Sequence, residues 1–217
     1  MGLDLLVESG AKPGHEAEWR RAMQSSFEQG LHSEAEIARF REISIPPYER
    51  LDPPRVGRDE AANAWILGVQ NATTPDEIAT VLRDFDGYFA VALVECDGVP
   101  KYSHGGLYDG LDETSFRGSF LTACGDVLGH DLIEDAWNHK MPDAAVSYGE
   151  ALLEAARAAS AAGAPPPKTR KSGFLAKLFA RDPPPGEPFE EQLKIVEAAG
   201  RWYVFWGERG HAIRAWS

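Results

Sequence analysis

The stretch of residues 102–117 brings together side chains that could do acid/base chemistry. His104 precedes two glycines, and Asp109 and Asp112 follow within eight residues. A histidine oriented by a carboxylate can take up and release protons near neutral pH, and Arg117 could hold an anion. One hypothesis is therefore an enzyme or small-ligand binder with His104 as acid/base. Three further residues of this stretch are weak binding candidates: Tyr102, Ser103 and Tyr108.

The same residues also fit a glycine-rich turn without activity. Asp112 or Thr114 would then cap a following helix. His-Gly-Gly resembles the oxyanion-hole loop of some esterases, but the chain has no Gly-x-Ser-x-Gly nucleophile elbow. Residues 109–113 lack the full ligand ladder of a calcium loop. The sequence carries no recognisable catalytic signature, so it favours a protein without enzymatic activity.

A second group of candidate residues lies between two triprolines, within residues 165–186. The segment has a formal charge of +4, whereas residues 1–164 have a charge of −15. Its basic side chains are Lys168, Arg170, Lys171, Lys177 and Arg181, and its apolar anchors are Phe174, Leu175, Leu178 and Phe179. On a helical wheel the anchors fall on one side, which is typical of an amphipathic helix.

A helix of about three turns is marginal in water, so its apolar face must dock on something. It could pack on its own domain, in a groove of a partner protein, or on an anionic membrane surface. A few basic residues and four apolar anchors would bind such a membrane only weakly. The leading hypothesis is a soluble, acidic, bacterial-type binding protein that acts through protein–protein interaction via this segment. Peripheral membrane attachment is an alternative.

Composition narrows the classes of partner and compartment. The 217-residue chain has a net charge of −12, which disfavours nucleic acid because binding it requires a basic surface. Its cysteines, Cys96 and Cys124, are too far apart in sequence for a metal knuckle. We expect reduced thiols, a cytoplasmic location and no transmembrane segment.

Histidines and carboxylates also recur at four-residue spacing between Asp126 and His139. A helical wheel places most of them opposite Leu128, Leu132 and Trp137, which indicates a solvated face. We therefore predict no metal site, and we expect no cofactor.

The elements that would position these residues form an α+β fold. Residues 1–8 are predicted to be a strand, residues 88–103 a central hairpin, and residues 192–216 a three-stranded meander. Together they would make one antiparallel sheet of about five to six strands, packed against several helices. The predicted helices cover residues 13–29, 33–45, 74–86, 117–139 and 142–162, a further helix begins at residue 59, and an extended loop or edge segment is predicted at 44–58.

The predicted organisation is a single domain with an excursion. Residues 1–164 form the α+β body, residues 165–186 the proline-flanked basic amphipathic segment, and residues 187–217 the C-terminal β-meander that completes the same domain.

Overall fold

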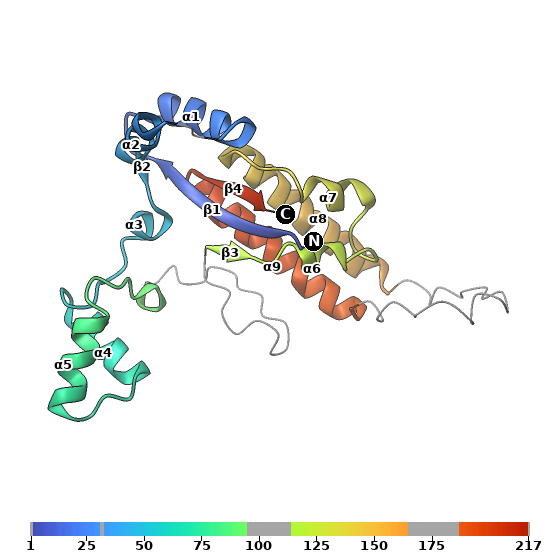
Figure 1. Ribbon diagram of the computed structural model, residues 1–217. Coiled ribbons are helices and arrows are strands. Elements are labelled where there is room, and N and C mark those ends of the chain that lie inside the picture. The colour runs from blue at the N-terminus through green and yellow to red at the C-terminus, as the bar shows by residue number, and fades with distance from the viewer. Residues whose placement is uncertain (1, 31–32, 95–113, 165–186, 217) are drawn as a thin grey trace, which may run out of the picture. The chain divides into compact units, whose positions relative to one another are not determined.

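The computed structural model describes residues 2–30, 33–94, 114–164 and 187–216 (Figure 1). The chain mixes helices with short strands, so the predicted α+β class is confirmed. It divides into two compact units. Unit 1 comprises Met1–Leu6, Pro100–Glu208 and Ile213–Ser217, and unit 2 comprises Val7–Val99 and Arg209–Ala212.

The sheet is built around the first strand. Its strands are β1 (Asp4–Ala11), β2 (Ser44–Ile45), β3 (Ser115–Phe116) and β4 (His211–Trp216). β1 pairs antiparallel with β2, where Gly10 faces Ile45, and with β3, where Leu5 faces Phe116; it also pairs with β4. Within the described residues the sheet thus has four strands, and the prediction of five to six is wrong.

The predicted C-terminal meander is wrong except for its last strand, which is β4. Residues 192–206 lie instead in helix α9 (Phe189–Glu208). Its buried positions recur at about 3.6 residues, as Leu193, Val196, Gly200, Tyr203 and Gly207 show. At Gly200, within the predicted meander, another helix approaches closely: a Cβ there would meet Leu153 and Gly149 O.

The predicted strand at residues 88–96 is also wrong over its described part. Residues Val91–Leu93 form a short 3₁₀ turn, and residue 89 makes only an isolated bridge to residue 55. The backbone here is bound to residue 56 instead: Gly87 N donates to Val56 O at 2.9 Å, and Val56 N donates to Tyr88 O at 3.0 Å. The return limb of the hairpin lies outside the described residues.

Two further predictions differ in detail. The helix expected at residues 117–139 is broken into α6 (Ser119–Thr122) and α7 (His130–Asp135). The segment at 44–58 contains, besides β2, the short helix α3 (Pro47–Leu51).

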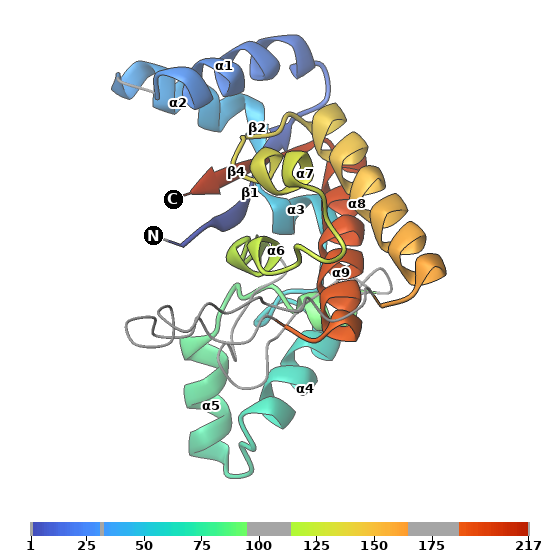
Figure 2. The same ribbon diagram turned by 90° about the vertical axis from the view of Figure 1, so that its right-hand side faces the viewer.

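The core of unit 1 is a pair of long helices, α8 (Pro142–Ala162) and α9, which lie side by side in Figures 1 and 2. α9 contributes Trp202, Tyr203 and Trp206, all fully buried. Tyr203 meets the ring of Tyr148 from α8 edge-on, and Trp202 contacts Phe116 of β3. The aromatic residues that the sequence placed on strands are therefore the core between two helices and the sheet.

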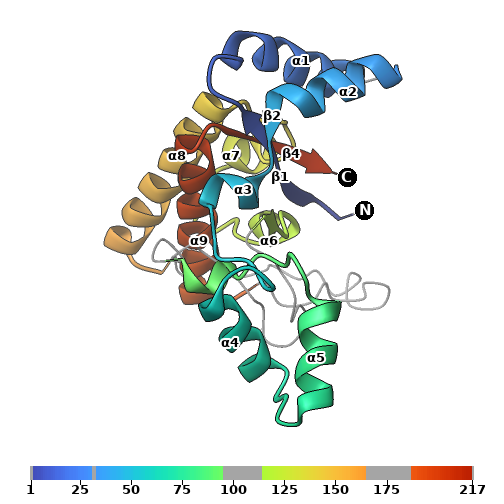
Figure 3. The same ribbon diagram turned by 90° about the vertical axis from the view of Figure 1, so that its left-hand side faces the viewer.

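Unit 2 consists mainly of two helical hairpins. Its helices are α1 (Glu16–Glu28), α2 (Glu34–Ile43), α4 (Glu60–Val69) and α5 (Pro75–Asp84). Reciprocal capping boxes start α2 at Ser33 and α5 at Thr74. In the α4–α5 hairpin (Figure 3) a small buried cluster holds Val56, Ala62, Ile66 and Ala90.

Among the described residues, no helix is both long and apolar enough to cross a membrane.

Candidate functional site

Of the candidates at residues 102–117, the structure places one. The guanidinium of Arg117 lies beside the first strand, with Nε 2.6 Å from Asp4 Oδ1. Its charge is therefore already met by a carboxylate of the same unit. The remaining candidates of this stretch lie outside the described residues: Tyr102, Ser103, His104, Tyr108, Asp109 and Asp112.

The basic amphipathic segment, residues 165–186, also lies outside the described residues, but both of its attachments are described. It joins α8 to α9 in the sequence. At the upstream attachment, Gly163 has φ of +78°, a conformation that favours glycine, and its N–H donates to Ala159 O at 3.0 Å. α8 therefore ends at a defined residue just before the first triproline.

The downstream attachment is held by a buried amide, Gln192 in the first turn of α9. Its Nε2 donates to Glu187 O at 2.7 Å and to Asp126 Oδ2 at 3.1 Å, while its Oε1 accepts from Asp126 N at 3.0 Å. These bonds fix residue 187, directly after the segment, to the loop that precedes α7. Sequence reasoning missed Gln192, because it was assigned to a strand; a lone amide on an apolar helix face was the available signal.

The α8–α9 pair that carries both attachments is packed through glycines. A Cβ at Gly149 would lie 2.7 Å from Gly200 O, and one at Gly200 would lie 2.7 Å from Leu153 Cγ. A Cβ at Gly207 would lie 2.7 Å from Val146 Cγ2. Real side chains do not tolerate such distances, so the two backbones approach closely only because these residues are glycine. The helices α8 and α9, which carry the two attachments, are therefore closely packed against each other.

Several titratable side chains are buried, and Cys124 is one of them. Burial raises the pKa of the Cys124 thiol to about 12, and its Sγ donates to Phe120 O at 3.2 Å. Cys124 is thus a buried free thiol in a structural role, because a thiol that stays protonated is a poor nucleophile. Cys96 lies outside the described residues.

Lys140, five residues after the end of α7, is almost fully buried. Its Nζ donates to Asp135 O at 2.6 Å and pairs with Asp135 Oδ1 at 3.1 Å, and it lies 4.3 Å from the centre of the Tyr148 ring. Burial lowers the pKa of Lys140, while Asp135 opposes that shift. The ammonium group of Lys140 thus binds the backbone carbonyl of the last residue of α7, so this buried charge has a structural role.

His211 is fully buried at the start of β4, and its Nδ1 lies 2.7 Å from Glu8 O. Because a carbonyl can only accept, Nδ1 carries the proton. Burial lowers the pKa of His211 to about 4, and the positive charges of Arg50 and Arg209 lower it further, against the hydrogen bond to Glu8. A neutral histidine thus links β4 to β1 within unit 2.

The acidic helix face around α7 shows no cluster of ligands. His130 Nε2 lies 3.6 Å from Glu134 Oε1, and both side chains are largely exposed. His139 Nδ1 accepts a hydrogen bond from the backbone N–H of Ala215 at 3.2 Å, so this ring binds the backbone of β4. In the described part of the chain, no group of three or more metal-ligating side chains comes together.

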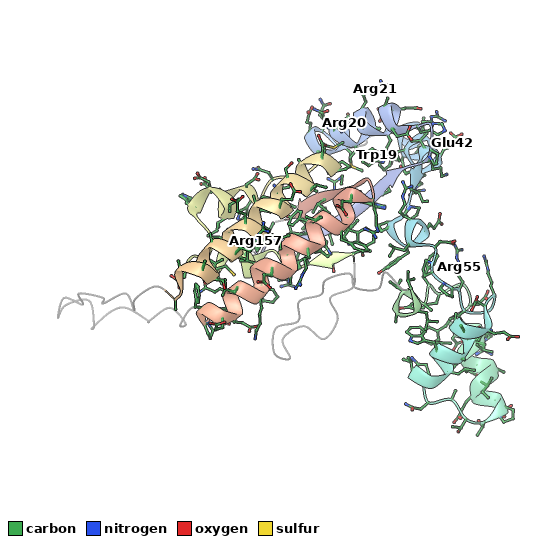
Figure 4. All side chains as sticks on the ribbon, turned by 180° about the vertical axis from the view of Figure 1, so that it is seen from behind. Trp19, Arg20, Arg21, Glu42, Arg55 and Arg157 are labelled. Carbon is green, nitrogen blue, oxygen red and sulfur yellow. The ribbon has the colours of Figure 1, made fainter. Side chains whose placement is uncertain are left out.

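A groove of about 340 Å³ runs between α1 and α2, with charged residues on its wall. Arg39 donates from Nε and Nη2 to both carboxylate oxygens of Glu18, at 2.8 and 2.7 Å, and from Nη1 to Glu42 at 2.7 Å. These bonds lower the pKa of Glu18 and raise that of Arg39. Figure 4 labels Glu42 at this hairpin. The charges of the wall are satisfied within the chain, and we assign no ligand to it.

Comparison of the chain with protein-family models, with curated proteins and with solved structures finds no match.

Proposed function

We propose that this protein is a cytoplasmic binding protein that acts through protein–protein interaction, using the basic amphipathic segment at residues 165–186. The observation that carries the proposal is the local reversal of charge. Five basic side chains and four apolar anchors stand between two triprolines in a chain whose preceding 164 residues have a formal charge of −15. A segment with these properties suits an acidic partner that has an apolar groove.

The attachments described above support this role. The downstream end is bonded through Gln192, and the α8–α9 pair is closely packed through three glycines. A binding segment that is attached at both of its ends has less conformational freedom to lose when it binds than one at the end of a flexible chain.

The test is affinity capture from native lysate with the full chain and two variants of equal charge change. In the first variant, the segment residues Lys168, Arg170 and Lys171 become glutamine. In the control, the exposed residues Arg20, Arg21 and Arg83 become glutamine. We expect a stoichiometric partner whose capture falls at least tenfold in the first variant and is unchanged in the control, because only the first alters the proposed interface.

A third variant replaces the anchors Phe174, Leu175, Leu178 and Phe179 with serine and tests the apolar face separately. Circular dichroism and thermal unfolding of each variant verify that the fold is retained. If capture survives in both segment variants, the segment is not the binding element and the proposal fails. If capture falls equally in the control, binding depends on net charge alone and the proposal also fails.

A further inference from the structure

The α4–α5 hairpin carries a pair of stacked aromatic rings at its surface. Trp65 of α4 and Tyr88, four residues after α5, have ring centres 6.3 Å apart and planes only 14° from parallel. Phe85 supports the pair from the edge, with its ring 5.8 Å from that of Tyr88 at 83°. Tyr88 is 51% exposed, although it is a large aromatic residue. Figure 3 shows the two helices of this hairpin, α4 and α5.

Packing and backbone hydrogen bonds hold the rings in place. Trp65 and Phe85 pack against the buried cluster of Val56, Ala62, Ile66 and Ala90. The backbone of Tyr88 is bonded on both sides: its N–H donates to Phe85 O at 2.9 Å, and its carbonyl accepts from Val56 N at 3.0 Å. A ligand that binds here therefore meets an ordered surface and does not have to pay for fixing it.

The polar atoms of the pair are the indole N–H of Trp65 and the phenol hydroxyl of Tyr88. The contacts of Trp65 and Tyr88 in the described residues are ring and apolar contacts. The indole N–H and the phenol hydroxyl thus make no hydrogen bond within the part of the chain that the structure describes. Two flat apolar faces with two available donors offer both packing and hydrogen bonding.

These features match one kind of ligand better than others. An extended proline-rich peptide has flat apolar rings, and its backbone carbonyls have no internal partners. Aromatic surfaces bind such peptides by packing on the prolines and donating to the carbonyls. An amphipathic helix would require a longer apolar groove with anchors several residues apart.

Charge selects further among such peptides. Residues 55–94, which form the hairpin and its flanks, carry three arginines and six carboxylates, a formal charge of −3. Arg55 is engaged within this unit, with its guanidinium 4.2 Å from the centre of the Phe89 ring (Figure 4). We infer that the Trp65–Tyr88 pair is a docking surface for an extended, proline-rich segment of a partner protein that carries basic residues.

The test uses the ¹⁵N-labelled full chain and a synthetic probe, a hexaproline peptide with one lysine at each end. The indole N–H resonance of Trp65 is assigned by its loss in Trp65→Phe, and that of Trp216, which is 63% exposed in the other unit, is the internal control. We expect saturable shifts of the Trp65 resonance but not of the Trp216 resonance. A peptide with alanine in place of proline, and one with glutamate in place of lysine, should bind at least tenfold more weakly.

Two matched variants locate the surface. Tyr88→Ala should weaken binding at least tenfold, whereas Val69→Ala, at a position of the same hairpin that is 53% exposed, should leave it unchanged. Tyr88→Phe keeps the ring and loses the hydroxyl, so it should give an intermediate loss even if Tyr88→Ala unfolds.

No shift at Trp65, equal shifts at Trp216, or equal binding of the alanine peptide would overturn the inference. These outcomes would leave the proposed role of residues 165–186 untouched, because that segment is not altered here.

Discussion

Two of the polar side chains buried in this protein, Gln192 and His211, join distant parts of the chain. Gln192 connects α9 to residues 126 and 187, and His211 connects β4 to β1. A buried polar group without a partner lowers the free energy of unfolding by about 1–3 kcal/mol, so these side chains are tolerated only because their hydrogen bonds are made. Their role is to fix which segments meet, and the sequence alone does not show which partners they bind.

The buried histidine predicts a dependence of stability on pH. The pKa of His211 is about 4 in the folded protein and near 6.5 in the unfolded chain. Between these values the unfolded chain holds a proton that the folded protein does not, so stability falls as pH falls from 6.5 to 4 and this contribution is constant above 6.5. A shift of this size corresponds to about 3 kcal/mol.

The measurement is urea unfolding of the wild type and of His211→Asn between pH 7 and pH 4. Asparagine still donates to Glu8 O but does not titrate. The free energy of unfolding of the wild type should fall by about 3 kcal/mol relative to the variant over this range. Parallel pH profiles for the two proteins would show that His211 is not buried in its neutral form.

Glycine residues occur in two different environments in the helices of this protein. Gly149 in α8 lies where α9 approaches closely, with Gly200 O and Tyr203 Cβ next to it. Gly68 in α4 has nothing within 4 Å of the position that a Cβ would take. Both lower the intrinsic stability of their helix, but only Gly149 permits a contact in return.

Substitution with alanine should therefore have opposite effects at the two sites. At Gly68 the free energy of unfolding should rise by up to about 1 kcal/mol, which is the gain in helix propensity. At Gly149 the added methyl group would lie 2.7 Å from Gly200 O, and overpacking of about 1–3 kcal/mol should outweigh that gain. Chemical denaturation of the two variants measures the difference, and a stabilised Gly149→Ala would show that α8 and α9 do not approach this closely.

Short sequence patterns predicted where helices start, but they did not predict contacts between residues far apart in the chain. The helix starts at Ser33 and Thr74 were predicted correctly, because the residues that indicate them lie within three positions of the start. Residues 201–206 fit both a period of two and a period of 3.6, and only the packing of α9 on α8 decides for the helix. The ion pair of Arg117 joins residues 113 positions apart, so no spacing in the sequence could indicate it.

At the scale of the whole molecule, the two compact units differ in their cores. Unit 1 buries Trp202, Tyr203 and Trp206 completely. In unit 2, the α4–α5 hairpin encloses a small cluster of Val56, Ala62, Ile66 and Ala90. Apolar area removed from water is the main source of stability, so the α8–α9 pair should hold its structure more strongly than the α4–α5 hairpin.

Native-state hydrogen exchange, read by NMR and corrected for intrinsic rates, measures this difference. Central amides of α9 should exchange at least a hundredfold more slowly than central amides of α5, because local opening of a hairpin with few buried contacts costs less free energy. Similar protection in the two helices would mean that both units open only together, in one cooperative transition.

The pairing of β1 with β4 also bears on how the protein is made in the cell. β1 ends at residue 11 and β4 begins at residue 211, so the first strand leaves the ribosome long before this partner has been synthesised. At the usual pace of translation the interval is roughly 10 to 40 s. During that time the nascent chain presents a strand edge that can pair with the wrong neighbour. Such a chain is a natural client for chaperones that act during translation.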